Sequence, residues 1–147
     1  MKIYIGSDHA GFELKAHLLR VLQVDGREVA DLGTDSAESV DYPDFAQKVA
    51  QAVLEDSSAT GIVICGTGIG VSIAANRFKG IRCALCQNVQ MATLARQHNN
   101  ANMLALGARL LTAPQAESIV NAFLAAEYEG GRHEQRLIKI DKMGGCG

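Results

Sequence analysis

Apolar and polar positions follow two different rhythms along the chain, and the rhythm changes repeatedly. Short, nearly continuous apolar runs predict strands, and apolar residues spaced by three or four positions predict amphipathic helices. The predicted strands cover residues 2–7, 28–32, 61–65, 80–86 and 102–106. The predicted helices cover residues 11–24, a segment opened by Asp41-Tyr42-Pro43, a short segment ending at Asn76, residues 88–97, and a segment that starts at Thr112.

The repeated alternation of strand and helix predicts the α/β class: a doubly wound, Rossmann-like sheet of five parallel strands with helices on both faces. The third strand, 61–65, is apolar throughout, which is typical of a parallel strand buried on both sides. A last helical segment, about 132–142, lies outside the alternation and predicts an extra C-terminal helix. We find no linker or repeat, so we expect a single domain over 1–147 with a flexible tail at about 143–147.

Composition then narrows the function classes. The chain has 147 residues, of which 48% are hydrophobic, so disorder of the whole chain is excluded. Its formal net charge of −2 argues against general nucleic-acid binding. No apolar run approaches the roughly 18 residues of a membrane span, and Asp8 comes too early for a signal peptide. The four cysteines form no disulfide framework, so we expect a cytoplasmic protein.

The third predicted strand runs directly into a glycine-rich loop, Gly66-Thr67-Gly68-Ile69-Gly70, which precedes a helix. Glycines at alternate positions let the backbone direct several N–H groups at one point, which suits a phosphate or an oxyanion. The alternative is a tight turn that binds nothing. The loop is not a P-loop, because no Gly-Lys-Ser/Thr follows it.

A dinucleotide site is disfavoured. The dinucleotide fingerprint belongs after the first strand, where this chain has Gly6-Ser7-Asp8-His9-Ala10-Gly11 and lacks the central glycine. Asp31 stands near the end of the second strand, where a ribose-binding acid would lie, but alone it is a weak signal. We therefore expect no NAD binding.

Cys65 lies at the junction between the buried strand and the glycine loop. A helix N-terminus close to a thiol favours the thiolate, which makes Cys65 a candidate nucleophile or general base. The alternative is that Cys65 is a small buried hydrophobe, the usual situation of a free cysteine. Cys83 and Cys86 lie three residues apart on a predicted strand and face opposite sides, so a shared zinc or redox site is disfavoured.

Two of the histidines are candidates for the same site. His9 directly follows the first strand beside Asp8, and His98 ends the helix before the fifth strand. We expect both at the edge of the sheet where the strands end, because open α/β sheets bind ligands there. Taken singly, each of them is more often structural than catalytic.

Arginines supply a candidate anion site. Arg132 and Arg136 are four residues apart and share one face of a helix, which suits a phosphate group. The alternative is a set of surface ion pairs with Glu129 and Glu134. Arg109, just after the fifth strand, adds a third positive charge at the carboxyl edge of the sheet.

Several motifs, taken together and in order, resemble one family. The chain is similar to the ribose-5-phosphate isomerase type B family of sugar-phosphate isomerases, which also contains the galactose-6-phosphate isomerase subunits. The resemblance runs from residue 1 to about 140. The motifs that carry it are Gly6 to Phe12, Asp41-Tyr42-Pro43, Cys65 to Gly70, Asn76-Arg77, Gly80-Ile81-Arg82, Arg96 to Asn99, and Gly130-Gly131-Arg132-His133 with Arg136.

The resemblance implies interconversion of ribose 5-phosphate and ribulose 5-phosphate through an enediolate, without a metal or another cofactor. Cys65 matches the family's general base, and His98 matches the residue that helps to open the furanose ring, with Asp8 near the ring oxygens. The implied substrate contacts are Thr67 and the amides of Gly66, Gly68, Ile69 and Gly70 at the enediolate, Asn99 at a hydroxyl, Tyr42 in the pocket wall, and His9, Arg109, Arg132 and Arg136 at the phosphate.

The resemblance also implies self-association, as a homodimer or tetramer whose active site is shared between subunits. We expect Arg132 and Arg136 to reach across that interface, and we expect no nucleic-acid or membrane partner. Two alternatives stay open. One is an isomerase of a six-carbon sugar phosphate, such as allose 6-phosphate or galactose 6-phosphate. The other is a non-catalytic sugar-phosphate binding module, which would not need Cys65 and His98.

Overall fold

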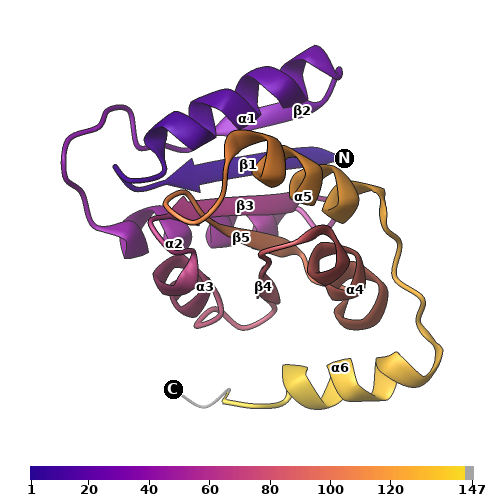
Figure 1. The fold of residues 1–147 in the computed structure, drawn as a ribbon. Helices are drawn as coiled ribbons and strands as arrows, with labels where there is room; N and C mark the ends of the chain where they lie inside the picture. Colours follow the sequence, from indigo (N-terminus) through magenta and orange to yellow (C-terminus); the bar gives the residue numbers. More distant parts are fainter. Residues whose placement is uncertain (145–147) are drawn as a thin grey trace.

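The five predicted strands form one parallel sheet in a computed structural model that describes residues 1–144. The strands are β1 (Lys2–Ser7), β2 (Glu28–Asp31), β3 (Thr60–Cys65), β4 (Cys83–Leu85) and β5 (Met103–Gly107), in the order β2-β1-β3-β5-β4 (Figure 1). The doubly wound α/β prediction is therefore confirmed. The predicted flexible tail lies, from residue 145 on, outside the described residues.

Helices cover both faces of this sheet because each carries one apolar stripe. The helices α1 (Phe12–Val24), α4 (Val89–Asn99) and α5 (Ala113–Ala125) pack on one face, against Ile62 and Ile64 of β3. The helices α2 (Tyr42–Glu55) and α3 (Ile69–Ala75) pack on the other face, against Val63. The central strand β3 is thus buried on both sides, as its unbroken apolar run predicts.

Local signals fix most of the boundaries. Gly26, with a φ of 78°, follows the end of α1. The predicted capping box between Thr112 and Gln115 is present at the start of α5. The predicted strand over 80–86 is wrong in extent, because only Cys83–Leu85 is extended and paired. Gly80 adopts a φ of 93°, which turns the chain just before this short edge strand.

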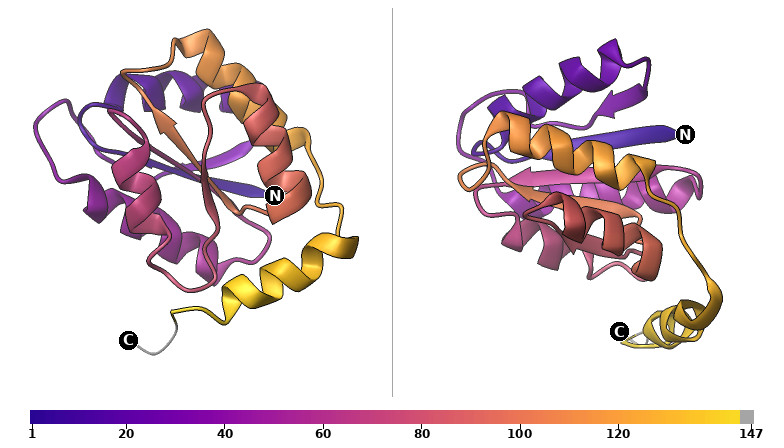
Figure 2. Two further views of the ribbon diagram at one scale, coloured as in Figure 1. Left: turned by 60° about the horizontal axis from the view of Figure 1, so that its bottom comes forward. Right: turned by 45° about the vertical axis from the view of Figure 1, so that its right-hand side comes forward.

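The extra C-terminal helix is present but lies apart from the sheet. A short helical turn, η1 (Gly131–His133), leads into α6 (Glu134–Asp141), which is set off from the main body in both views of Figure 2. Leu137 is its only buried residue, and Asp141 lies 3.4 Å from Arg82. Among the described residues, no helix is long and apolar enough to cross a membrane.

Candidate active site

The ends of β1 and β3 lie side by side, and the chain leaves them toward opposite faces of the sheet. Ser7 pairs with Ile64 across these two strands. The chain continues from β1 into α1 on one face and from β3 into α3 on the other. Such a switch point opens a crevice at the carboxyl edge of the sheet, where α/β proteins bind ligands.

The glycine loop after β3 lies at this edge of the sheet. Gly68 adopts a φ of 79°, and a Cβ there would lie 2.6 Å from the Leu85 side chain, so only glycine fits. The amide N–H groups of Thr67 and Gly70 donate to no acceptor in the part of the chain that the structure describes. Both groups are therefore available to a bound anion, as the glycine spacing predicts.

Cys65 is the last residue of β3 and lies under this loop, with 5% of its surface exposed. Its Sγ accepts a hydrogen bond from the N–H of Gly68 at 3.2 Å. The sulfur therefore lies at the start of the glycine loop, in hydrogen-bond contact with its backbone.

Asp8 and His9 lie at the same edge of the sheet, directly after β1. Asp8 is buried, and its Oδ1 accepts the N–H of Gly11 at 3.1 Å. The Nδ1 of His9 accepts the N–H of Val40 at 3.2 Å. The proton of a neutral His9 ring then lies on Nε2, which can donate to a ligand.

Two further predicted residues border the same loop. A Cβ on Gly66 would lie 3.0 Å from a guanidinium nitrogen of Arg109. The backbone N–H of Arg109 donates to the Gly66 carbonyl. A Cβ on Gly70 would lie 2.5 Å from the ring of Tyr42, so the two residues are in direct contact. The structure thus brings Asp8, His9, Tyr42, Cys65, Gly66, Thr67, Gly68, Ile69, Gly70 and Arg109 to one edge.

His98 and Asn99 lie at the opposite edge, so the expectation that His9 and His98 share one edge is wrong. They end α4, which leads into the start of β5, where Gly61 donates to Asn102. Four residue steps along β3, from Gly61 to Cys65, separate this level from the other edge, about 13 Å at 3.3 Å per residue. A helix between parallel strands runs back toward their starts, so its last residues lie at the amino edge.

Arg132 and Arg136 belong to this amino-edge group as well. The Glu129 N–H, just before η1, donates to the Gln97 carbonyl at 3.0 Å, which ties the segment to the end of α4. Within residues 1–144, no carboxylate lies within ion-pair distance of either arginine. The surface ion-pair hypothesis is therefore wrong, and both guanidinium groups can receive an anion.

Sequence reasoning missed the neighbours of His98. The His98 ring stacks on that of His133, with centroids 4.4 Å apart, and the Glu129 carboxylate faces both rings. The four-residue spacing of Glu129 and His133 was an available signal for that pair. Their proximity to His98, about 30 positions earlier, had no signal in the sequence.

The disfavoured roles of Asp31 in nucleotide binding and of Cys83 and Cys86 in a zinc or redox site have no support in the structure, where all three residues have structural contacts. Asp31 Oδ1 accepts Lys15 Nζ at 2.7 Å and the Gly33 N–H at 2.9 Å, so it serves the fold. Cys83 and Cys86 contact opposite hydrophobic clusters. Burial raises the pKa of Cys83 to about 12 and the pKa of Cys86 to about 11, so both stay neutral thiols.

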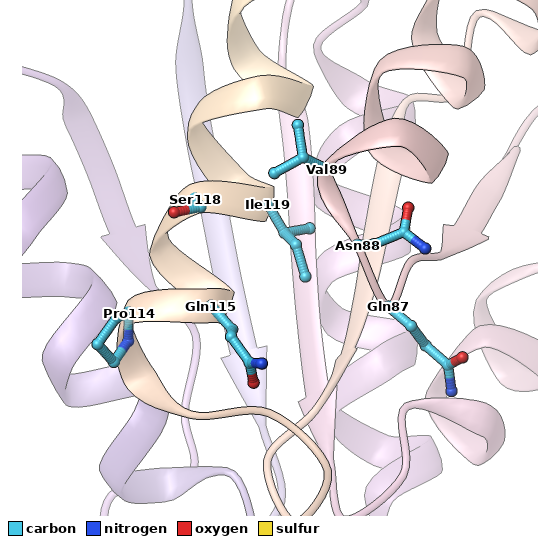
Figure 3. Close-up of a pocket in the computed structure, with 7 residues that line it drawn as sticks. All are labelled: Gln87, Asn88, Val89, Pro114, Gln115, Ser118 and Ile119. Carbon is cyan, nitrogen blue, oxygen red and sulfur yellow. The ribbon is translucent and has the colours of Figure 1, made fainter.

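A pocket of about 350 Å³ lies between the starts of α4 and α5. Figure 3 shows its walls, with Asn88 and Val89 from one side and Gln115 and Ile119 from the other. None of the predicted catalytic side chains lines it. Its lining is uncharged, so the pocket lacks the groups that a phosphorylated ligand requires.

The fold is that of an α/β protein with free loop N–H groups at its switch point, and comparison identifies the family. The family model for Ribose/Galactose Isomerase matches residues 3–140. Ribose-5-phosphate isomerase B of Escherichia coli K12 is 51% identical over 139 residues, which cover 95% of this chain and 93% of that protein. The chain belongs to the ribose/galactose isomerase family.

Solved structures agree with this assignment. Ribose-5-phosphate isomerase B from Clostridium thermocellum matches with a TM-score of 0.94 and 54% identity, covering 96% of this chain and 95% of that one. The Mycoplasma genitalium enzyme, solved with bound ribulose-5-phosphate, matches with a TM-score of 0.93 and 46% identity, covering 95% of this chain and 93% of that one.

Proposed function

We propose that this chain is a cytoplasmic isomerase that interconverts ribose 5-phosphate and ribulose 5-phosphate. The observation that carries the proposal is the position of the Cys65 sulfur at the start of a loop with free N–H groups. Relatives similar over nearly the whole chain support the substrate, including one solved with ribulose-5-phosphate bound. Removing a proton α to a carbonyl needs a base beside an anion-stabilising group, and this edge carries both.

In the proposed reaction, the Cys65 thiolate takes the proton from C2 of the open-chain aldose and returns it to C1. We assign the negative charge that develops on the carbonyl oxygen to the free amides of Thr67 and Gly70 and to the Thr67 hydroxyl. One such donor typically contributes about 3 kcal/mol to transition-state stabilisation. The carbon-bound proton moves from C2 to C1 and the hydroxyl proton moves from O2 to O1, so the step is balanced without an oxidant or a metal.

Other residues bind and open the sugar. We assign ring opening to Asp8 and His98, which exchange protons with the ring oxygen and the anomeric hydroxyl. Asn99 binds a sugar hydroxyl, and Tyr42 lines the pocket. The phosphate is assigned to four cationic side chains, since binding it away from the reacting carbons makes the proton transfer effectively intramolecular. They are His9, Arg109, Arg132 and Arg136.

This assignment requires a second copy of the chain. Cys65 and His98 lie at opposite edges, about 13 Å apart along the strands alone. A two-fold homodimer would place the amino-edge group of one subunit at the carboxyl edge of the other and would form two equal sites. Exposed apolar residues on α3 and α6, among them Ile69, Ile73 and Ile138, offer surface for such an interface.

A six-carbon sugar phosphate is the second candidate substrate, because the family description includes a galactose isomerase. Its chemistry would be the same, and only the length of the pocket would differ. Five-carbon and six-carbon phosphates compared with one protein preparation separate the two. A non-catalytic binding module would turn over neither.

The test is interconversion of ribose 5-phosphate and ribulose 5-phosphate by the purified chain with a chelator present. We expect activity in the chelator, and its loss in Cys65→Ala. Cys83→Ala is the matched control, because that thiol is partly buried against a hydrophobic cluster on the edge strand β4, and its loss is expected to leave turnover unchanged. Unchanged turnover in Cys65→Ala would remove Cys65 from the mechanism.

A further inference from the structure

Three side chains of the amino-edge group converge on one point without bonding to each other. The Nε2 of His98 lies 3.8 Å from Glu129 Oε1, and the Nε2 of His133 lies 3.6 Å from the same oxygen. All three potential ligand atoms lie within 4.8 Å of one another. Separations of 3.6 and 3.8 Å exceed the length of a hydrogen bond, so the three groups leave room for a small ion between them.

The backbone holds this cluster in place from two sides. His98 is fixed in the last turn of α4, and the Glu129 N–H donates to the neighbouring Gln97 carbonyl. His133 is buried, and its N–H donates to the Gly130 carbonyl. The backbone of all three residues thus has a defined position before any ligand arrives, which lowers the entropic cost of binding one.

We infer that His98, Glu129 and His133 form a binding site for a divalent transition-metal ion such as Zn²⁺. Two imidazoles and one carboxylate are a ligand set that zinc accepts, with a fourth position left for water. With metal–ligand bonds of about 2.0–2.1 Å, tetrahedral ligands lie roughly 3.3 Å apart. The two histidine–glutamate separations therefore need to close by only a few tenths of an ångström, whereas the two histidine rings must turn out of their stacked arrangement so that both Nε2 atoms face one ion.

The bound ion would inhibit rather than assist turnover. This consequence rests on the proposed function, in which the His98 ring exchanges protons during ring opening. A metal on Nε2 occupies the lone pair that this exchange needs. The site is thus a place where zinc competes with catalysis, and it is separate from the metal-free proton transfer at Cys65.

Metal binding is measured directly, without reference to activity. The full chain is stripped with a chelator and titrated with Co²⁺, whose visible absorption reports coordination, and with Zn²⁺ against a chromophoric chelator. We expect one ion per chain. Loss of a group that only orients a metal ligand costs about 10–100-fold in affinity, so Glu129→Gln and His133→Gln should each weaken binding at least tenfold.

Two control variants test where the ion binds. His17→Gln removes a histidine that lies 3.2 Å from Glu117, a pair with only two ligands, and should leave metal affinity unchanged. Cys65→Ala should also retain the ion, which excludes binding at the thiol. Glu129 has a half-exposed side chain, so Glu129→Gln is expected to fold normally, and its circular dichroism spectrum checks this.

Inhibition forms the second arm of the test. Zn²⁺ should lower turnover of the wild-type chain, excess chelator should restore it, and Glu129→Gln should need at least about tenfold more Zn²⁺. Failure to bind Co²⁺ or Zn²⁺, or binding that Glu129→Gln and His133→Gln leave unchanged, overturns the inference. An inactive chain that still binds one ion through these residues would refute the proposed function and retain the metal site.

Discussion

The separation of Cys65 from His98 leads to a quantitative prediction about mixed subunits. Cys65→Ala removes the proposed base, and His98→Gln removes the proposed ring-opening group. Each variant alone is expected to be inactive. Because the two residues lie at opposite edges of one chain, each active site of the proposed dimer would take Cys65 from one subunit and His98 from the other.

The size of the recovered activity follows from this arrangement. When the two variants are mixed in equal amounts and exchange subunits freely, half of the dimers contain one chain of each kind. Each mixed dimer has one site with both defects and one site with neither. Because half of the dimers are mixed and each mixed dimer has one intact site out of two, the mixture should have about a quarter of the wild-type activity per chain.

The assay measures ribulose 5-phosphate formation after the two variants, carrying different affinity tags, have been unfolded and refolded together. Recovery of both tags in one complex proves exchange. The matched control mixes wild-type chains with the double variant Cys65→Ala/His98→Gln, in which every mixed dimer is inactive. Exchange should then lower the activity of the mixture from about half to about a quarter of the wild-type value.

Inactivity of the first mixture, with mixed complexes present, would refute the shared site. It would mean that Cys65 and His98 act within one chain, or that one of them has no part in turnover. The second mixture separates these outcomes from a failure of exchange. If it stays at half of the wild-type activity while both tags are recovered together, sites are complete within single chains.

Three further predictions concern single residues. Gly68→Ala should lower the free energy of unfolding by about 1–3 kcal/mol, measured by urea denaturation, since a φ of 79° disfavours any Cβ there. Phe123→Ala should lower it by about 3–5 kcal/mol in the same measurement, because that ring is 1% exposed in the core. Iodoacetamide at pH 8 should leave Cys86 and Cys83 unmodified in peptide mass maps, because their pKa values of about 11 and about 12 keep them protonated; rapid labelling of either would contradict this.

The fold could be predicted because its strongest signals are local. The apolar run at 61–65 predicts a buried parallel strand, and the capping residues at 112–115 predict the start of a helix. The strand at 83–85 was predicted too long, since a glycine with positive φ at position 80 cannot be distinguished from a strand glycine by its sequence. The strand β4 lies at the edge of the sheet and pairs only with β5, so few backbone hydrogen bonds hold its flanking residues in an extended conformation.

The candidate site could be predicted only in part, because sheet topology fixes the positions of some of its residues and not of others. Asp8 and Cys65 follow strands directly, so sheet topology alone assigns them to the carboxyl edge. His98 follows a helix, and the same topology assigns it to the other edge. The contact of Glu129 and His133 with His98 depends on the path of the segment after α5. The pattern of apolar and polar residues does not predict that path.

In the proposed dimer, the helix α6 would link assembly to substrate binding. It has eight residues and one buried side chain, Leu137, and helices of this length are marginal without tertiary packing. Arg136 on α6, and Arg132 just before it, therefore depend on packing beyond their own helix for a fixed position. In the proposed dimer, the partner subunit supplies that packing and the bound phosphate supplies the opposing charge.

A ligand that binds only the assembled site stabilises the assembly by the same free energy that assembly contributes to its binding. Substrate binding and subunit association in this chain are therefore expected to reinforce each other.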